Sequence, residues 1–501
     1  MLGIVGYGAY IPRLRLSRKA VVQANAWYAP QFAAKAKGTR AFANWDEDSI
    51  TMAVAAARDC LGSDADRARI RGLYLASCTV PFVERSNAGI VGEALLLDET
   101  IDAIDITGSQ RAALSALTLA LAKAQRAGEQ LVLAADLRQA RAASAQELEF
   151  GDGAAALLLG TEGVIAEYLG GATLSVDFVD HFRSADAEVD YAWEERWVRD
   201  EGVGKLMPRA IGAALADAGI DAAAVDHFIF PSTIAKLDAQ LAGTCGIRSE
   251  AVVDNLQGRI GDTGTAHGLL MLAHTLERAT PGQVILVSQF GSGAQALLFR
   301  VTGAALAAAD RTTTVGAAPV VRPVKGVGAW LARGIEETSY TKFLAFRQQL
   351  ILEKGMRGEQ DKKTALSTLY RHRRSILGFV AGRCSITGEV HFPPSRISYT
   401  PGAPALDTQQ PYPLSERRGT VLSWSAEYLS YYPSPPQYYG QVDFDGGGRV
   451  LMEFVDVSKG EIESGTRVEM VFRIKDVDER RGFVRYFWKA TPVRAPAAAK
   501  E

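Results

Sequence analysis

The stretch that decides the fold is IGDTGTAHGLLMLAHTLERATPGQVILVSQFGSGAQALLF, residues 260–299. A helix begins near His267, the β-branched run QVILVSQF follows at 283–290, and the turn Gly291-Ser292-Gly293 comes next. The same alternation of short apolar runs with Ala-rich helical segments extends outward from Met1 to about Arg300. This alternation is typical of a layered α/β fold.

Other strands and helices follow from the same patterns. The helices are expected at 49–61 and 111–128, the first opened by the cap Asp46-Glu47-Asp48-Ser49, whose carboxylates and hydroxyl stabilise a helix N-terminus. Further strand-like runs are GIVGYGAYI (3–11), GLYLAS (72–77), AIDIT (103–107), QLVLAAD (130–136), GAAALLLG (153–160) and HFIFPS (227–232).

A weak internal repeat indicates a duplication. Residues 46–77 and 200–232 both contain an acidic cap, an Ala-rich helix, an acidic turn, an apolar strand and a small polar residue. Two related halves packed on each other explain the repeat, since each half alone leaves one sheet face uncovered. Chance similarity of two Ala-rich helices is the alternative.

Length and composition exclude several classes of protein. The 501 residues correspond to about three domains. Hydrophobic residues make up 48% and charged residues 22%, which is ordinary globular composition. The formal charge of −2 gives no whole-protein attraction to nucleic acid or to an anionic membrane, so neither is expected as a partner.

Cysteine usage and the N-terminus favour a cytoplasmic protein. Cys60, Cys78, Cys245 and Cys384 are far apart, so they predict neither a disulfide framework nor a zinc knuckle. The first residues lack a signal-peptide pattern, and no apolar run reaches the roughly 18 residues that span a bilayer.

The last hundred residues change to alternating β patterns. Five short strand-like runs, each bounded by turn residues, predict a small barrel of the OB type. An OB barrel can bind nucleic acid, but the many carboxylates on these strands argue against it: Asp443, Asp445, Glu453, Asp456, Glu461, Glu463, Glu469 and Asp476.

Four phrases, in this order, resemble the thiolase superfamily and most closely its 3-hydroxy-3-methylglutaryl-CoA synthase branch. They are GIVGYGAYIPR (3–13), SNAGIVGEAL (86–95), ELEFGDGAAALLLG (147–160) and residues 260–299. The resemblance covers roughly residues 1–355. It implies an αβαβα five-layer fold of two duplicated halves, carbon–carbon bond chemistry on acyl thioesters, and a homodimer.

The segment from about residue 360 resembles the zinc-ribbon plus OB domain that accompanies such proteins as a separate acyl-CoA-associated chain. GRCSITGEVHFPPSRI (382–397) and GTVLSWSAEY (419–428) carry this likeness. A structural zinc site needs four ligands, but Thr387 follows Cys384 at the second ligand position, so no bound zinc is expected. His391 is expected on a strand surface. The predicted domains are 1–165, 166–356 and 357–501.

The resemblance also locates the catalytic positions, and this chain departs from the family at each of them. Gln110 falls on the nucleophilic cysteine, Pro231 on the histidine, Cys78 on the glutamate and Asp262 on an asparagine. An amide has no nucleophilic lone pair at neutral pH, so Gln110 excludes an acyl-enzyme at that residue. Ser109 is the remaining candidate nucleophile, although no histidine is expected beside it.

Enolate chemistry remains available, because it needs only a carbonyl cradle and one acid/base. Gln110 is the candidate amide donor, Asp262 or Cys78 the base, and His267 an acid/base; the remaining expected substrate contacts are Gly291, Ser292, Gly293, Ser232, Arg111, Arg373 and Arg374. Each has a structural alternative. Gln110 fills the volume of a lost cysteine, Cys78 is a small buried apolar residue, Asp262 is a turn residue, and His267 caps a helix.

The sequence therefore predicts an enzyme that makes or breaks a carbon–carbon bond on a coenzyme A thioester, by aldol, retro-aldol or decarboxylation chemistry, without an acyl-cysteine. No tightly bound cofactor and no metal are expected. One alternative is a non-catalytic acyl-CoA-binding scaffold for a cysteine-bearing thiolase subunit. Another is a synthase-like acyltransferase that uses Ser109.

Overall fold

The chain folds into two compact units. The computed structural model describes residues 1–62, 67–304, 312–315, 318–321, 326–355, 364–400, 402 and 404–494. Unit 1 comprises Met1–Asn44, Asp48–Gly89 and Asp98–Arg347, and unit 2 comprises Trp45–Glu47, Ile90–Leu97 and the chain from Gln348 onward. The predicted boundary at 356/357 lies outside the described residues, and the boundary at 165/166 stays a prediction.

A nine-stranded mixed sheet runs through unit 1. Its order is β11 (His227–Ile229), β12 (Val284–Phe290), β13 (Gly293–Val301), β8 (Ala166–Ser175), β1 (Gly3–Tyr10), β7 (Asp152–Gly160), β6 (Glu129–Leu137), β4 (Ile70–Ala76) and β5 (Asp102–Ile106). Six of these strands, β1, β4, β5, β6, β7 and β11, overlap the strand-like runs predicted outside residues 260–299. Strand β12 overlaps the run QVILVSQF predicted at 283–290.

The sheet consists of two halves with the same connectivity. In the first half β1 pairs antiparallel with β7, β7 antiparallel with β6, and β6 parallel with β4. In the second half β8, β13, β12 and β11 repeat this sequence of antiparallel, antiparallel and parallel pairs. The halves join where Gly3 and Ile4 of β1 pair with Glu167 and Ala166 of β8. The predicted duplicated fold is confirmed.

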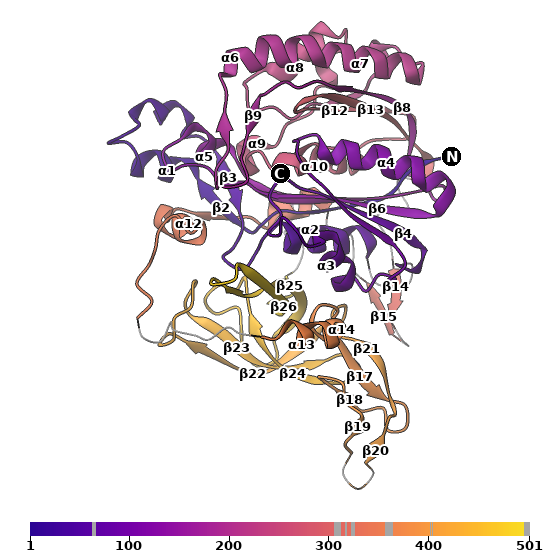
Figure 1. Ribbon diagram of the computed structural model, residues 1–501, viewed down its shortest axis with the longest axis vertical. Coiled ribbons are helices and arrows are strands. Elements are labelled where there is room, and N and C mark those ends of the chain that lie inside the picture. The colour runs from indigo at the N-terminus through magenta and orange to yellow at the C-terminus, as the bar shows by residue number, and fades with distance from the viewer. Residues whose placement is uncertain are drawn as a thin grey trace. The chain divides into compact units, whose positions relative to one another are not determined.

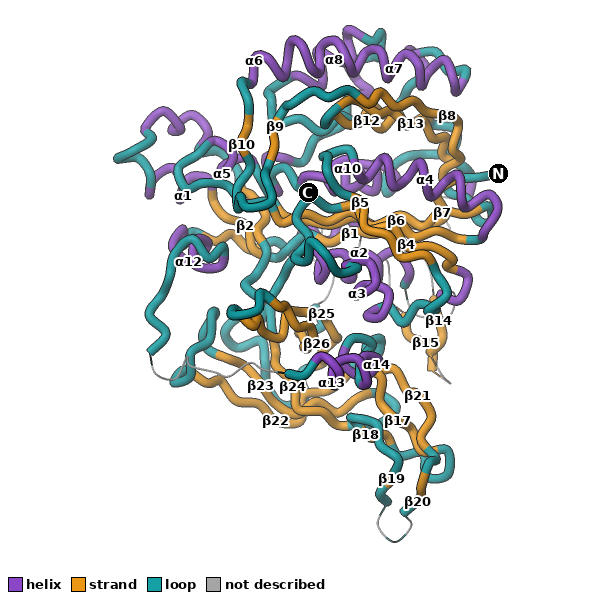
Figure 2. Tube along the Cα trace, viewed as in Figure 1, coloured by secondary structure: helices purple, strands orange, loops and turns teal. Residues whose placement is uncertain are grey.

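Helices complete five layers (Figure 1). Helices α4 (Ala112–Ala127) and α10 (His267–Leu276) lie between the two half-sheets, and each packs against strands of both (Figure 2). Helix α2 (Ser49–Leu61) covers the outer face of β1, β6 and β7. Helices α7 (Gly204–Ala218) and α8 (Leu237–Thr244) form the other outer layer, with α7 packed on β8 and β13.

The acidic residues predicted to cap α2 have different partners in the structure. Asp48 accepts a hydrogen bond from the Thr51 N–H at 2.9 Å, and the Asp48 N–H donates to Thr51 Oγ1 at 2.8 Å, which is a complete capping box. Asp46 and Glu47 belong to unit 2, where they pair with Lys489 and Arg473. Only Asp48 therefore caps the helix, although all of residues 46–49 were predicted to do so.

Shorter elements surround the sheet in unit 1. β16, β2 and β3 form a three-stranded sheet, and β9 and β10 form a two-stranded ribbon. The bounds of the shorter elements are β2 Leu14–Ser17, α1 Arg18–Ala24, η1 Pro30–Lys35, β3 Thr39–Phe42, η2 Arg67–Arg69, α3 Asn87–Ala94 (which extends into unit 2), α5 Ala145–Glu149, β9 His181–Phe182, β10 Tyr191–Ala192, α6 Glu195–Trp197, η3 Val198–Val203, η4 Ala222–Ala224, η5 Ser249–Ala251, α9 Gln257–Ile260, η6 Gly264–Ala266, β14 Thr312–Val315, β15 Ala318–Val321, α11 Gly326–Ala332, β16 Ile335–Glu337 and α12 Tyr340–Phe346.

Unit 2 contains the predicted barrel. Its five strands close in the order β22 (Gly419–Glu427), β23 (Gln437–Phe444), β24 (Arg449–Phe454), β26 (Phe483–Pro492) and β25 (Arg467–Asp478). These strands coincide with the five predicted runs, so the all-β prediction is confirmed. Preceding them are α13 (Leu366–Arg371), α14 (Arg373–Ile376), β17 (Val380–Cys384), β18 (Val390–His391), β19 (Ile397–Ser398), β20 (Ala405–Leu406) and β21 (Gln409–Pro413).

Buried charges hold this barrel as well as apolar side chains. Trp488 and Phe454 are almost fully buried in its core. The Lys489 ammonium is also buried and lies 3.0 Å from both Asp46 Oδ2 and Glu453 Oε2. None of the described helices in either unit has the length and apolar character needed to cross a membrane.

Candidate functional site

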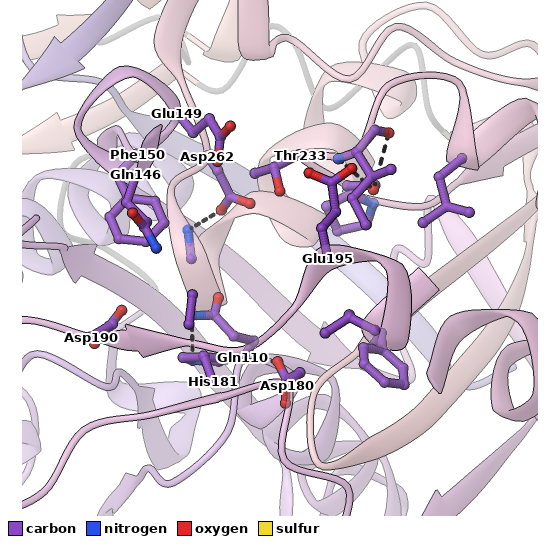
Figure 3. A pocket seen from close by; sticks show the side chains of 18 of the residues that line it. Gln110, Gln146, Glu149, Phe150, Asp180, His181, Asp190, Glu195, Thr233 and Asp262 are labelled. Atoms are coloured by element: carbon purple, nitrogen blue, oxygen red, sulfur yellow. Dashed lines mark hydrogen bonds and ion pairs between the residues drawn. The ribbon is translucent and has the colours of Figure 1, made fainter. Parts of the chain in front are cut away.

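A cavity of about 330 Å³ lies in unit 1 and is lined by residues of both halves. Gln110 comes from the first half, and His181, Pro231 and Asp262 come from the second. Figure 3 shows Gln110, His181 and Asp180 grouped together, with Asp262 and Glu149 in another part of the wall. Two of the sequence-predicted catalytic residues, Gln110 and Asp262, therefore share one cavity.

Gln110 lies two residues before α4, in the loop that follows β5. Its Nε2 is 3.4 Å from Nε2 of His181. His181 lies in β9, and its Nδ1 is 2.6 Å from Oδ2 of Asp180. Because the carboxylate requires a proton on Nδ1, the neutral ring presents the Nε2 lone pair toward Gln110. The Gln110 amide then donates to His181, and the ring has the orientation of a general base.

The Asp180 carboxylate is held in its charged form. Burial alone would raise its pKa, but the hydrogen bond and charge of His181 and the Ser292 N–H outweigh burial, so the pKa of Asp180 lies below its usual range. The Ser292 N–H lies 3.4 Å from Asp180 Oδ1. A charged Asp180 fixes the tautomer of His181 and would stabilise the imidazolium formed by proton uptake.

A second polar cluster surrounds Arg138. Its guanidinium lies 3.0 Å from Asp190 Oδ2 and 3.6 Å from Asp262 Oδ1, and it stacks 3.5 Å from the Phe150 ring centroid. Arg183 lies 3.5 Å from the other oxygen of Asp190. These pairs tie the ribbon that carries His181 to the end of β6, which fixes the base relative to the cavity wall.

Cys78 is not placed as a base. Burial, followed by the charge of Asp136, raises the pKa of its thiol to about 12, so the thiolate is scarce at neutral pH. Its N–H donates to Asp136 Oδ1 at 2.8 Å, and its carbonyl accepts from Arg183. Cys78 is not one of the described residues that line the cavity. The backbone of Cys78 therefore anchors Asp136 and Arg183, and its role as a base stays a prediction.

His267 also has a structural place. The side chain is fully buried, its Nδ1 accepts from the Thr263 N–H at 3.1 Å, and its Nε2 donates to the Asn255 carbonyl at 2.7 Å. Both ring nitrogens thus have hydrogen-bond partners, and His267 is not one of the described residues that line the cavity. These contacts make His267 a clamp at the start of α10, and its expected acid/base role stays a prediction.

The glycine turn 291–293 supports the start of α4 rather than a substrate carbonyl. The Gly291 carbonyl accepts from Ser109 Oγ at 2.7 Å and from Arg111 Nε at 3.1 Å. The Gly291 N–H donates to the Gly293 carbonyl at 3.0 Å. The N–H of Ser292, as described above, faces Asp180. The N–H groups of Gly291 and Ser292, two of the expected substrate contacts, therefore already have acceptors.

The same contacts bear on Ser109 and Arg111. The Ser109 hydroxyl donates to the Gly291 carbonyl, so its proton is directed to a backbone acceptor rather than to a side-chain base. The Arg111 guanidinium reaches Ser115 Oγ at 3.3 Å and Ser175 Oγ at 3.2 Å. Neither residue belongs to the described cavity lining. Ser232 does line it, and its Oγ accepts from the Ile234 N–H at 3.1 Å.

Gly291 provides a test of this support. Its φ is 158°, and an added Cβ would lie 2.9 Å from Ser109 Oγ and 3.1 Å from Gln110 Cβ. We expect Gly291→Ala to displace Gln110 and to lower the free energy of unfolding by about 1–3 kcal/mol in urea titrations. Gly212→Ala, in open space inside α7, is the control and should stabilise the protein by about 0.5–1 kcal/mol. Equal effects of the two substitutions would contradict the role given to Gly291.

Two of the predicted substrate-binding residues, Arg373 and Arg374, belong to unit 2. Arg373 and Arg374 are in α14, where Arg373 Nε lies 2.8 Å from Glu93 Oε1. Every residue that lines the cavity belongs to unit 1. Cys384 Sγ accepts from the Thr387 N–H at 3.4 Å and lies 3.2 Å from Thr408 Oγ1. Within the described ranges, no cluster of three or more His, Cys, Asp or Glu side chains is placed to hold a metal ion.

Comparisons with known proteins agree with both units. Residues 215–301 match the family described as 3-oxoacyl-[acyl-carrier-protein] synthase III C terminal, and residues 410–473 match the C-terminal OB-fold domain of ChsH2. A solved 3-oxoacyl-[acyl-carrier-protein] synthase III from Aquifex aeolicus superposes with a TM-score of 0.53 at 20% identity, covering 60% of this chain and all of that one. Unit 1 therefore has the fold of the thiolase-like condensing enzymes.

Sequence similarity narrows this class. A hydroxymethylglutaryl-CoA synthase of Archaeoglobus fulgidus is 30% identical over 318 residues, which cover 61% of this chain and 90% of the relative. A solved HMG-CoA synthase complexed with CoA has the same fold, with a TM-score of 0.56 at 16% identity over 72% of this chain and 95% of that one. The chain belongs to the hydroxymethylglutaryl-CoA synthase family.

Sequence reasoning missed the ribbon of the cavity. Asp180, His181, Asp190 and Arg138 were not singled out, because the segment after β8 has no clear helical or strand period. One signal was available, since His181 is one of only six histidines and follows directly on an aspartate. An Asp-His pair in a segment without secondary-structure period is a reasonable candidate for an oriented base.

Proposed function

We propose that this protein cleaves or forms a carbon–carbon bond in a coenzyme A thioester by aldol chemistry, without an acyl-enzyme. The single observation that supports this most is the pair Gln110 and His181 in one cavity, 3.4 Å apart, with His181 oriented by Asp180. A base and an amide donor are the groups that enolate chemistry needs, and a nucleophile is not among them. Membership of a family whose relatives are named CoA synthases supports the thioester.

In the cleavage direction, the substrate 3-hydroxyl group takes the place of the Gln110 amide at His181 Nε2, and Nε2 accepts the hydroxyl proton. The bond between Cα and Cβ breaks, and its electron pair moves into the thioester carbonyl to give an enolate, while Cβ leaves as an aldehyde or a ketone. The Gln110 amide donates to the enolate oxygen. The protonated His181 then returns its proton to Cα, so no oxidant or reductant is required. Asp180 stabilises the intermediate imidazolium.

A panel of 3-hydroxyacyl-CoA and 3-ketoacyl-CoA thioesters tests the proposal. We expect the 3-hydroxyacyl compounds to release a shorter acyl-CoA together with an aldehyde or ketone, detected by chromatography and carbonyl trapping. Release of CO2 from a 3-ketoacyl or malonyl-type thioester would instead indicate decarboxylation. Binding of CoA thioesters without turnover of any of them would overturn the catalytic proposal.

Gln110→Cys gives a second test of the site. A thiol at this position would lie at the N-terminal end of α4 and within reach of His181, which together favour the thiolate. We expect acetyl-CoA to leave an acetyl group on the 105–117 segment of this variant, seen as a mass increase of the corresponding peptide. Wild type and Gln110→Ala are the controls and should stay unmodified. An adduct on Ser109 in the wild type would support the acyltransferase alternative.

We also propose that the protein forms a homodimer, as the family resemblance implies. The edge strand β5 ends the nine-stranded sheet, so one of its edges is left unpaired by the sheet itself. Its Ile104 side chain is 43% exposed. Light scattering should give twice the mass of 53.8 kDa, and Ile104→Lys should reduce the mass to that of one chain. A monomeric wild type at micromolar concentration would contradict this.

A scaffold subunit is the second candidate function. The absence of a cysteine at Gln110 and the match of unit 2 to the ChsH2 OB-fold domain favour it. In this case the chain would bind acyl-CoA and a cysteine-bearing thiolase. Co-purification with such a thiolase, together with loss of the partner's rate when this chain is removed, would support the scaffold. Turnover of a CoA thioester by the purified chain alone would support the enzyme.

A further inference from the structure

We infer that the cavity selects an acyl group without a carboxylate, and that Asp262 is a residue that sets this preference. The inference rests on the proposed function, since it concerns the acyl part of the same thioester. It differs from what the relatives' name denotes, because a hydroxymethylglutaryl group ends in a carboxylate.

The charge of the residues that line the cavity is the first observation behind the inference. Five carboxylates line it, from Glu149, Asp180, Asp190, Glu195 and Asp262, whereas the lining cations are Lys35 and Arg138. Lys35 Nζ lies 2.5 Å from Glu149 Oε1, and the Arg138 guanidinium lies 3.0 Å from Asp190. Both cations are thus already paired. A substrate carboxylate would enter a wall of its own sign, where repulsion is weakly screened in a partly enclosed site.

Another part of the lining suits a hydrocarbon chain. Val203 ends the π-helix η3, Phe230 follows β11, and Leu237 begins α8; all three are buried in one apolar cluster, and Ile234 and Phe290 pack against it. These five side chains also line the cavity. Apolar contact favours an uncharged alkyl chain, since each buried methylene contributes about 0.8 kcal/mol.

Asp262 is a lining carboxylate whose charge can be removed while its contacts are kept. Its Oδ1 accepts the Gly264 N–H at 2.7 Å and lies 3.6 Å from Arg138. Both contacts involve the same oxygen, so an asparagine could keep them with its own Oδ1 while removing the charge. The family resemblance also implies an asparagine at this position.

The experiment measures binding of two thioethers, S-octyl-CoA and S-(7-carboxyheptyl)-CoA, by calorimetry at low salt. They have the same chain length, and they lack the thioester carbonyl, so they cannot react. We expect wild type to bind the neutral probe at least tenfold more tightly. Asp262→Asn should tighten binding of the carboxylated probe by about tenfold and leave the neutral probe unchanged. Added KCl should narrow the wild-type preference.

Asp254→Asn is the matched control, because Asp254 is exposed, pairs with Arg259 at 2.9 Å, and lies outside the described lining. It should change neither affinity. Glu195→Gln is a second lining variant, which should shift the carboxylated probe in the same direction if Asp262→Asn does not fold. Equal wild-type affinities for both probes, or equal shifts of both in Asp262→Asn, would overturn the inference.

The outcome is separable from that of the proposed function. Discrimination between the two probes with no turnover of any thioester would leave the inference standing and reject the enzyme. Turnover of carboxylated and neutral 3-hydroxyacyl-CoA at equal kcat/KM would reject the inference and keep the enzyme.

Discussion

Replacement of His181 by asparagine is expected to lower kcat for 3-hydroxyacyl-CoA cleavage by about 10²–10⁴-fold, the usual contribution of an oriented general base. Asparagine keeps a polar side chain in the ribbon but has no basic nitrogen to take the hydroxyl proton. KM should change little, because the loss falls on the chemical step. Stopped-flow assay of the shorter acyl-CoA measures both constants.

Two further variants make this result specific. His372→Asn removes an exposed histidine of unit 2 and should leave kcat unchanged. Asp180→Asn should also lower kcat, since His181 would lose the carboxylate that fixes its tautomer. A kcat in His181→Asn within about twofold of wild type would remove the base from the mechanism. Unchanged hydrogen exchange in β6 and β13 would show that the fold of unit 1 persists.

Replacement of Lys489 by methionine is expected to destabilise the barrel of unit 2 by about 3–5 kcal/mol, the cost of leaving a buried charge without its partner. Asp46 and Glu453 both face this ammonium at 3.0 Å, and Asp46 is fully buried. Methionine fills a similar volume, so the loss reflects charge rather than a cavity. Hydrogen exchange of amides in β25 and β26 reports on this unit alone.

Lys475→Met is the matched control, since Lys475 pairs with the same Glu453 at 2.5 Å but is 47% exposed. It should cost at most about 1 kcal/mol. The pH dependence follows from Glu453. Burial would raise its pKa, but the charges of Lys489 and Lys475 hold it below its usual range. Its stabilising contribution is present above the unfolded pKa and is lost as the pH falls through the folded pKa. The Lys489→Met effect should therefore shrink in acid, and an equal effect of both lysines would refute the argument.

The architecture was predictable because its elements carry local signals. Helix α2 has the predicted bounds 49–61, and α4 differs from the predicted 111–128 by one residue at each end. In the barrel, β23 and β24 alternate buried residues with less buried ones over most of their length, a pattern that a single sequence displays. β8 was not predicted, because its run AEYLGGATLS mixes glycine with polar residues and is only partly buried. Its pairing with β13 and β1, rather than its own composition, makes it a strand.

Residues of the candidate site were predictable only where they stand in a sequence motif. Gln110 and Asp262 were located through the family resemblance, which places Gln110 at the nucleophile motif and Asp262 at a glycine-rich turn. The contacts of His267 were not predictable, since they involve two backbone groups, Thr263 N–H and Asn255 C=O, that no spacing reveals. His181 was missed because it is distant from the other site residues in the sequence. It is 71 residues from Gln110, and only the packing of the halves brings them together.

The middle layer has a consequence for the order of synthesis. Helix α4 is complete once residue 127 has left the ribosome, yet Gln295 of β13 provides hydrogen bonds to the Leu114 carbonyl and to Thr118 Oγ1. A nascent first half must therefore keep an apolar, half-covered helix soluble while about 170 further residues are translated, which takes roughly ten seconds or more. Chains arrested in this interval should be the protease-sensitive and chaperone-bound forms of the protein.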